Sequence, residues 1–328
     1  MYLNDLENYP TLNDGICKSM TCWDRYRIRF ALWPSLQGTP KGTVCLLHGR
    51  AEFIEKYYEV IMELRQRGFA VATFDWRGQG MSERLIPNQN KGYVRKFSDY
   101  GKDLEQFIKK VMLPDCPPPH FVLAHSMGGL VLLSNLPRLR TMIERAVLSA
   151  PLIEIATSHK RLMGLKIQQS GIRKVSAFLR LFGQGAMFMP GVSSSPFDPQ
   201  GFYSNAVTSD GPRYDRNRQF LIDFPKLAIG GPTVQWVHET CKVIDKLQSS
   251  DFQATIHTPT LIVTAGQDTV VNSLASEYFA RTTRSVNSVG IAGSKHELMM
   301  ERDMIRQQFW AAFDSFIPGE APIKIAAA

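Results

Sequence analysis

The sequence is poor in cysteine and has no long apolar run. Its five cysteines are odd in number and scattered along the chain: Cys17, Cys22, Cys45, Cys116 and Cys241. This distribution argues against a disulfide framework and against a zinc site, and it favours reduced thiols. No apolar run approaches the length of about 18 residues that spans a bilayer, and the opening MYLNDLENYPTLNDG has acidic side chains where a secretory signal has an apolar segment. We therefore expect a cytoplasmic protein.

The composition is that of a globular protein with an excess of positive charge. Apolar residues make up 44% and charged residues 21% of the 328 residues, which suits one large α/β domain with insertions or two ordinary domains. The net charge of +8 permits nucleic-acid binding, but the sequence has no recognisable binding module for it. We expect no nucleic-acid partner, because attraction to an anionic membrane explains the charge more simply.

Short apolar runs bounded by glycine or proline recur along the chain. Continuous runs of this kind are typical of parallel strands that are covered on both faces. The runs are GTVCLLHG (42–49), GFAVATFD (68–75), HFVLAH (120–125), RAVLSAP (145–151) and TPTLIVTAGQD (258–268). Residues 25–33, RYRIRFALW, alternate charged and apolar side chains instead, which predicts an antiparallel edge strand with one face in water.

Helical spacing fills the intervals between these runs. Apolar residues recur about one helical turn apart in three segments. The segments are marked by Ile54, Tyr57, Tyr58 and Ile61, by Leu104, Phe107, Ile108 and Val111, and by Ile305, Phe309, Ala312, Phe313 and Phe316. The alternation predicts an α/β fold, with a mostly parallel central sheet and helices on both faces.

The alternation stops between residues 152 and 235. This stretch includes the Met-, Gly- and Pro-rich GQGAMFMPGVSSSPFDPQG, and the sheet pattern resumes only at TPTLIV. We predict a core made of residues 1–151 and 236–328, interrupted by an inserted cap or lid over residues 152–235.

Ser126 lies in LAHSMGG, between a predicted strand and an apolar helix. Open α/β sheets place reactive groups at the carboxyl ends of their strands, and a serine in a tight turn there exposes its hydroxyl. Ala124 and Gly128, two positions before and after, are small enough to let the turn close. The usual pattern is G-x-S-x-G, so Ala124 is a departure, and the motif taken alone also fits a structural turn serine.

A nucleophilic serine needs a base that is itself oriented by an acid. On this type of sheet the partners follow in the order Ser, Asp or Glu, His, each just beyond a strand. Asp268 ends LIVTAGQD and His296 lies in GSKHELMMERD, so order and position both fit. Alone, each also fits a helix cap or a packing residue, but together with Ser126 they predict a catalytic triad. His125, which adjoins the serine, is predicted to pack behind the turn and not to act as the base.

Attack of a serine on a carbonyl also requires donors for the oxyanion. One is predicted to be the backbone N–H of Met127, and the other the N–H of Arg50 in HGRAEF, the loop after TVCLL. His48 is predicted to orient this loop, while Glu52 either braces the loop or touches the substrate. No metal or organic cofactor is required for this chemistry.

Seven stretches resemble, in the same order, the α/β-hydrolase fold and within it the serine hydrolases of the monoacylglycerol lipase and bacterial lysophospholipase L2 group. They are LLHGRAEFIEKY, FDWRGQGMSER, SDYGKDLEQFI, LAHSMGG, VLSAP, TPTLIVTAGQDTVV and GSKHELMMERD, and they cover about residues 25–150 and 255–315. HGRAEF departs from the small residues that usually follow HG, although a backbone donor survives the change. The resemblance implies Ser126 as nucleophile, Asp268 and His296 as acid and base, Arg50 and Met127 as oxyanion donors, and the insertion as a cap over an acyl pocket.

The inserted segment is basic and apolar. Residues 155–197 contain no Asp or Glu. Six basic residues are interleaved with apolar ones in this range: Lys160, Arg161, Lys166, Arg173, Lys174 and Arg180. Such a segment over a hydrolase pocket suits an anionic membrane or a phosphate-bearing lipid. The alternative is a solvated helix face whose apolar residues pack on the domain below, and the sequence favours neither.

Together these features predict a serine carboxylic ester hydrolase acting on lipid-like monoacyl esters, lysophospholipid or monoacylglycerol, through an acyl-enzyme on Ser126. Small-ester esterases, amidases and serine aminopeptidases use the same triad, and chains of this fold can also lose catalysis and serve in binding. An aminopeptidase would need carboxylates for the substrate amine, which the acid-free range 155–197 disfavours. The expected partner is a small-molecule lipid ester, with peripheral contact to the inner face of an anionic membrane if the cap docks on lipid.

Overall fold

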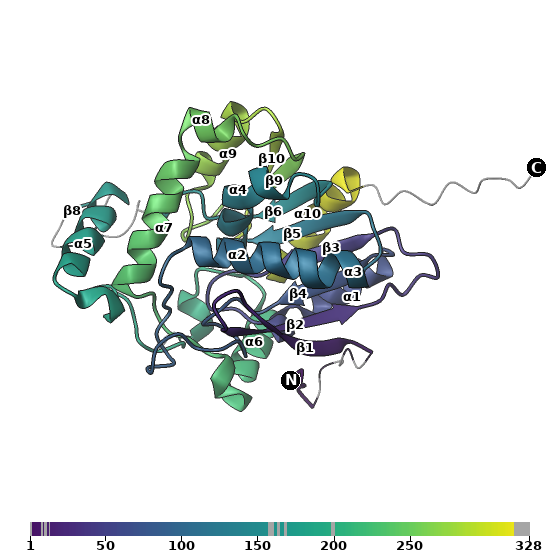
Figure 1. The fold of residues 1–328 in the computed structure, drawn as a ribbon, viewed down its shortest axis with the longest axis horizontal. Coiled ribbons are helices and arrows are strands. Elements are labelled where there is room, and N and C mark those ends of the chain that lie inside the picture. The colour runs from purple at the N-terminus through teal and green to yellow at the C-terminus, as the bar shows by residue number, and fades with distance from the viewer. Residues whose placement is uncertain are drawn as a thin grey trace, which may run out of the picture.

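A computed structural model of the protein shows an eight-stranded sheet between layers of helices (Figure 1). The structure describes residues 2–7, 9, 12, 14–156, 161–162, 165–166, 169–197 and 201–317. The strand order is β1-β2-β4-β3-β5-β6-β9-β10, with parallel pairing from β4 to β10 and antiparallel pairing of β1 and β2. The strands are β1 (Ile16–Thr21), β2 (Arg27–Trp33), β3 (Thr43–Leu47), β4 (Ala70–Phe74), β5 (His120–His125), β6 (Arg145–Ser149), β9 (Thr260–Ala265) and β10 (Val286–Ile291).

The five apolar runs form the centre of the sheet, as predicted. Every residue of β3, β4 and β9 is buried, because helices cover both faces of the parallel strands. The helices that connect the strands are α1 (Tyr58–Gln66), α2 (Ser98–Phe107), α3 (Leu113–Asp115), α4 (Met127–Leu139) and α9 (Ser273–Thr282), and α10 (Asp303–Phe316) follows the last strand. Figure 1 shows α2 in front of the sheet and α1 and α10 behind it. The predicted α/β fold is confirmed.

The prediction of an edge strand with one wet face was wrong for residues 25–33. β2 is the second strand of the sheet, since the short, largely exposed β1 pairs with it on the outside. Its alternation of charge misled the prediction because Arg29 points into the interior and is fully buried. β1, ICKSMT, has neither a continuous apolar run nor a strict alternation, so no periodicity marked it.

Arg29 joins three segments through a buried ion cluster. Its guanidinium lies 2.6 Å from Glu55 Oε1 and 2.6 Å from Asp75 Oδ2, and none of these side chains is exposed. Burial opposes charge on the Asp75 carboxyl, but the nearby Arg29 guanidinium keeps its pKa below the usual range. The cluster ties β2 to the end of β4 and to the turn that precedes α1.

Between β6 and β9 the chain leaves the sheet. The described part of this excursion contains the hairpin strands β7 (Arg161–Leu162) and β8 (Leu165–Lys166), followed by helices α5 (Gln169–Leu181), α6 (Gly211–Asp223), α7 (Val234–Leu247) and α8 (Ser250–Gln253). Figure 1 shows α5 beyond α7, at the left end of the sheet. Lys160 and the side chains of Arg161 and Lys166 lie outside the described residues. No helix in the described part of the chain is long and apolar enough to cross a bilayer.

Replacement of Arg29 by Met should lower the free energy of unfolding by about 3–5 kcal/mol, because Glu55 and Asp75 would remain buried without their cation. Arg27→Met, two residues earlier in β2, is the control: its side chain is 65% exposed, and the loss should stay within about 0.5 kcal/mol. Urea denaturation followed by circular dichroism measures both. A loss for Arg29→Met no larger than that of the control would show that the cluster does not stabilise the sheet.

Candidate active site

Ser126 occupies a strained turn between β5 and α4. Its φ of 49° and ψ of −114° lie in a region that non-glycine residues rarely adopt. The turn brings the start of α4 against the end of β3, so close that a Cβ on Gly128 would lie 2.6 Å from the carbonyl oxygen of Leu47. Glycine is therefore required at position 128, and Ala124, fully buried in β5, completes the tight turn that the motif predicted.

Ser126, His296 and Asp268 form a hydrogen-bonded chain, although they come from three separate parts of the sequence. Nε2 of His296 lies 3.0 Å from Ser126 Oγ, and Nδ1 lies 2.7 Å from Asp268 Oδ2. Burial would raise the pKa of the Asp268 carboxyl, but the bonds from His296, Val270 and Val271 hold it below its usual range. The ionised carboxylate accepts the Nδ1 proton, so Nε2 is left to accept the serine hydroxyl proton.

His125 packs behind the turn. Its Nδ1 lies 3.0 Å from the carbonyl oxygen of Ser149, and its ring centroid lies 4.8 Å from that of His296. Burial lowers the pKa of His125 to about 4, so the imidazole is neutral at physiological pH and Nδ1 donates to Ser149. A neutral ring here places no positive charge beside His296.

Three consecutive amides follow β3, and only the middle one is free. Gly49 N–H donates to the carboxylate of Glu52, and Ala51 N–H donates to Gln79 Oε1 at 2.7 Å. Among the residues that the structure describes, neither the Arg50 N–H nor the Met127 N–H has an acceptor. The two amides predicted as oxyanion donors are thus unpaired, at the start of α4 and in the loop after β3.

Gln79 connects the two segments that carry these amides. Its Oε1 accepts from the N–H of Ala51, and its Nε2 lies 3.6 Å from Sδ of Met127. Gln79 is only 2% exposed. Ala51 has a φ of 62°, so the acceptor on Gln79 stabilises a backbone conformation that alanine disfavours. Sequence reasoning missed Gln79, although it lies in the stretch FDWRGQGMSER.

Glu52 braces the loop, which settles an alternative left open by the sequence. One carboxylate oxygen accepts from Gly49 N–H and from Tyr57 Oη at 2.8 Å; the other lies 2.7 Å from Lys56 Nζ. Lys56 lies 2.6 Å from Glu297, the residue after His296. Burial disfavours the charged Glu52, but Lys56 holds its pKa well below the usual range. The loop before α1 and the histidine loop are therefore joined by buried charges.

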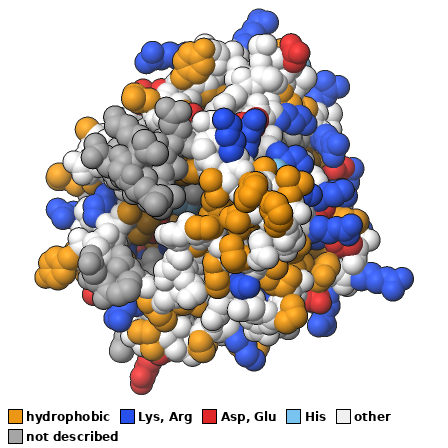
Figure 2. All heavy atoms as spheres, turned by 90° about the vertical axis from the view of Figure 1, so that its left-hand side faces the viewer, with side chains coloured by type: hydrophobic (Ala, Val, Ile, Leu, Met, Phe, Trp, Pro, Cys, Tyr) orange, Lys and Arg blue, Asp and Glu red, His pale blue; other side chains and the backbone are white. Residues whose placement is uncertain are grey.

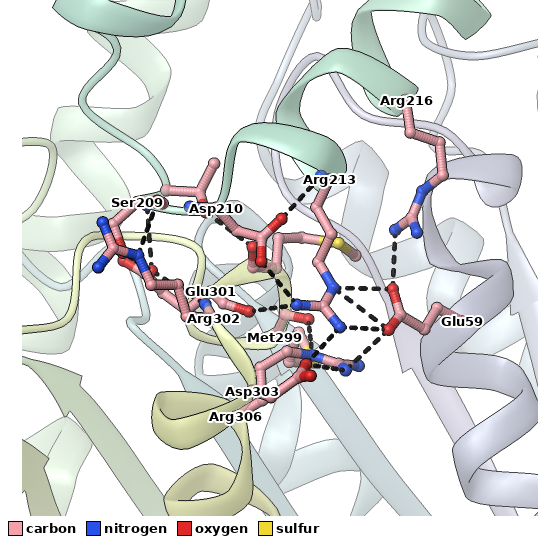
Figure 3. Close-up of polar contacts among 12 residues, drawn as sticks. Glu59, Ser209, Asp210, Arg213, Arg216, Met299, Glu301, Arg302, Asp303 and Arg306 are labelled. Carbon is pink, nitrogen blue, oxygen red and sulfur yellow. Dashed lines mark hydrogen bonds and ion pairs between the residues drawn. The ribbon is translucent and has the colours of Figure 1, made fainter.

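A second set of bonds anchors the histidine loop to residues 205–213 of the insertion (Figure 3). Glu297 N–H donates to the carbonyl of Val207 at 2.8 Å, and Thr208 Oγ1 donates to that of Met300 at 2.7 Å. Arg213 donates to the carbonyl of Glu301 at 2.9 Å and pairs with Glu59 of α1 at 2.6 Å.

Figure 3 shows the Arg213 side chain reaching from the insertion toward both partners. Burial would raise the pKa of Glu59, but the guanidinium groups of Arg213, Arg306 and Arg216 lower it to about 2. Sequence reasoning missed this contact, since Glu59 and Arg213 share no motif.

Among the described residues no group of three or more His, Cys, Asp or Glu side chains could hold a metal ion. The described side chains and amides of the site form two layers: the Ser126, His296 and Asp268 chain with the free amides, and the buried side chains that fix them in place.

The sequence profile of the family described as serine aminopeptidase, S33, matches residues 38–303, most of the chain. The protein belongs to this family. This S33-family serine hydrolase is 30% identical over 270 residues to lysophospholipase L2 of Escherichia coli strain K12. The match covers 80% of this chain and 76% of that protein. It is 28% identical over 272 residues to a probable lysophospholipase L2 of Haemophilus influenzae, covering 83% and 82%.

The S33-family hydrolase also resembles a solved structure over nearly its whole length. A soluble variant of the monoglyceride lipase of Saccharomyces cerevisiae, in complex with a substrate analog, matches with a TM-score of 0.71 at 21% identity, covering 95% of this chain and 99% of that one. The two proteins share the α/β-hydrolase fold, as predicted.

Gln79→Leu should lower kcat for a p-nitrophenyl ester by about 10- to 100-fold with little change in KM, because Ala51 N–H would lose its acceptor and the Arg50 amide would shift. Gln253→Leu is the control. Gln253, in α8, is also a buried glutamine that bonds to the backbone, since its side chain donates to the carbonyl of Leu247, and it lies away from the site. Steady-state kinetics of both variants decide the matter. Equal losses, or a normal kcat for Gln79→Leu, would rule out this positioning role.

Proposed function

We propose that this S33-family hydrolase cleaves lipid-like monoacyl esters, lysophospholipids or monoacylglycerols, through an acyl-enzyme on Ser126. The observation that carries the proposal is the chain of hydrogen bonds from Ser126 through His296 to Asp268, at 3.0 and 2.7 Å. The names of the relatives, lysophospholipase L2 and monoglyceride lipase, support the class of ester.

The reaction proceeds in two halves. His296 Nε2 takes the hydroxyl proton as Ser126 Oγ bonds to the ester carbonyl carbon, and Asp268 stabilises the resulting imidazolium. The C–O bond to the alcohol breaks, and the alcohol leaves with the proton from His296. Water then gives a proton to His296 and attacks the acyl carbon, which releases the fatty acid and restores the serine hydroxyl.

The amides of Arg50 and Met127 stabilise the oxyanion in both halves of the reaction. Both are free of other acceptors in the described residues, and one such donor is worth about 3–4 kcal/mol of barrier. Glu52 and Gln79 hold the amides on either side of Arg50, so little reorganisation accompanies the charge that develops. The proposed chemistry uses no metal and no organic cofactor.

Residues 152–235 act in this proposal as a cap on a core of residues 1–151 and 236–328. The segment leaves the sheet after β6, and α5 lies outside the eight-stranded sheet, beyond α7 (Figure 1). The Arg173–Asp245 ion pair and the bond from Arg180 Nε to Gln235 at 3.0 Å attach α5 to α7. Arg173 and Arg180 thereby hold one face of α5 against α7, and side chains on the rest of the helix are exposed.

The free face of α5 is suited to an anionic lipid surface. Its side chains Phe178, Leu181 and Phe182 are 59%, 82% and 66% exposed. Figure 2 looks onto this side of the molecule and shows hydrophobic side chains gathered near the middle of the face, with Lys and Arg toward its edge. Apolar side chains flanked by basic ones insert into the interface of anionic membranes, and we infer peripheral docking on the inner face of such a membrane.

A serine aminopeptidase or amidase, or an esterase for small esters, is the alternative. The family description itself names an aminopeptidase. The exposed apolar face of α5 and the absence of Asp and Glu from residues 155–197 favour the lipid ester, because a substrate amine would need a carboxylate.

Ser126→Ala should abolish release of fatty acid from lysophosphatidylcholine and monoacylglycerol while leaving the melting temperature almost unchanged, because the hydroxyl is the nucleophile. The two lipids and p-nitrophenyl acetate are compared side by side with purified protein, and free fatty acid or nitrophenol is measured. Full hydrolysis by the variant would refute the assignment of the nucleophile. Activity on the acetate alone would identify a small-ester esterase.

Leu181→Ser should reduce co-sedimentation with phosphatidylglycerol vesicles by about tenfold, since one inserted leucine side chain would be lost. Leu274→Ser on α9 is the matched control, because Leu274 is 74% exposed against 82% for Leu181 but lies on another part of the surface (Figure 1). Wild-type protein that showed no preference for anionic over neutral vesicles would count against docking.

A further inference from the structure

Among the described residues, the side chain of Arg50 has no carboxylate partner. Its Nη1 donates to the carbonyl of Gly230 at 2.9 Å, and its Cζ lies 5.7 Å from the ring centroid of Trp236. No carboxylate oxygen of the described residues lies within ion-pair distance of it. A guanidinium has five N–H donors, and the carbonyl of Gly230 is the one acceptor that the described residues give it.

The four fully buried arginines of the described residues contrast with Arg50, which is half-buried. Each is paired with at least one carboxylate: Arg29, Arg65, Arg77 and Arg306. A charge removed from water and left unpaired is costly, and proteins normally neutralise it. Burial lowers the pKa of Arg50 to about 10, which still leaves the guanidinium charged at neutral pH.

Arg50 also supplies the amide predicted to bind the ester oxyanion. The guanidinium lies roughly five bonds from its own Cα, and the phosphorus of a 1-acyl lysophospholipid lies roughly six bonds from the ester carbonyl carbon, so both spans are about 6–8 Å. One residue can therefore contact the reacting carbonyl through its backbone and a headgroup anion through its side chain.

We propose that the Arg50 guanidinium binds the phosphate of a glycerophospholipid headgroup, and so selects lysophospholipid over monoacylglycerol. The assignment rests on the proposed ester hydrolysis and names the substrate within that class. Paired N–H donors match two phosphate oxygens, which is the geometry in which guanidinium binds phosphate most tightly. The bond to Gly230 and the ring of Trp236 hold the guanidinium in one position.

Arg84 offers a matched control. It too lacks a carboxylate among the described residues, and its guanidinium donates to the carbonyls of Ser82 and Lys226. Burial lowers its pKa to about 10, as for Arg50. Both arginines join the core to residues 226–230, so loss of either tests attachment of that segment, whereas only Arg50 adjoins the oxyanion loop.

The decisive measurement is the ratio of kcat/KM for lysophosphatidylcholine to kcat/KM for monoacylglycerol of the same acyl chain. Any damage to the oxyanion loop affects both esters and cancels in the ratio. Arg50→Met should lower the ratio by about 10- to 100-fold, and Arg50→Lys should recover part of it. Arg84→Met should leave it unchanged. A ratio for Arg50→Met within twofold of wild type, or an equal fall in the Arg84 variant, overturns the proposal.

Binding to the Ser126→Ala protein decides the question even if the wild-type enzyme hydrolyses neither lipid, an outcome that would refute the proposed function separately. Titration with lysophosphatidylcholine below its micelle concentration should give a Kd at least tenfold lower than for the Ser126→Ala, Arg50→Met double variant, with monoacylglycerol unaffected. Equal affinities in the two proteins overturn the assignment. Inorganic phosphate that binds as tightly as the lipid would identify a free-phosphate site instead and also overturn it.

Discussion

The contact between the first turn of α4 and the end of β3 is the constraint on which the site depends. It exists because Ser126 accepts a positive φ and because Gly128 has no Cβ to collide with the carbonyl of Leu47. The contact sets the Met127 amide beside the loop that follows β3, and it raises the serine hydroxyl above the carboxyl edge of the sheet. A helix that stood farther from β3 would move the Met127 amide away from the Arg50 amide, and the proposed oxyanion site needs both.

Buried polar contacts around the loop after β3 and the loop of His296 keep this arrangement rigid. Gln79 and Glu52 hold the amides that flank Arg50, and Lys56 carries the connection on to Glu297 beside His296. Such groups are stable inside a protein only when every member is paired, and here Lys56 pairs with both carboxylates. In the proposed mechanism the site is therefore preorganised: the two amides are fixed before substrate arrives, and the reaction does not have to orient them.

Much of the fold and of the candidate site follows from local sequence patterns, and what does not follow is long-range. The buried parallel strands β3, β4, β5, β6 and β9 are continuous apolar runs, and Ser126 and Asp268 lie just beyond two of them. His296 follows β10, a largely exposed strand, and was found from its order in the chain. Arg29 was misjudged because the sequence around it alternates as a wet strand would, while its partners are 26 and 46 residues away. Gln79 and Arg213 act through contacts that no spacing along the chain encodes.

The bonds between residues 205–213 and the histidine loop give the insertion a divided character. Its earlier part, around α5, contacts α7 and carries exposed apolar side chains, whereas its later part holds the loop that contains His296. Substitutions around α5 can alter the substrates that the protein accepts while the base keeps its place. Exchange of the whole insertion between relatives would change both the α5 region and the contacts that hold the His296 loop. A segment that recombination exchanges without disturbing His296 therefore has to end before residue 205.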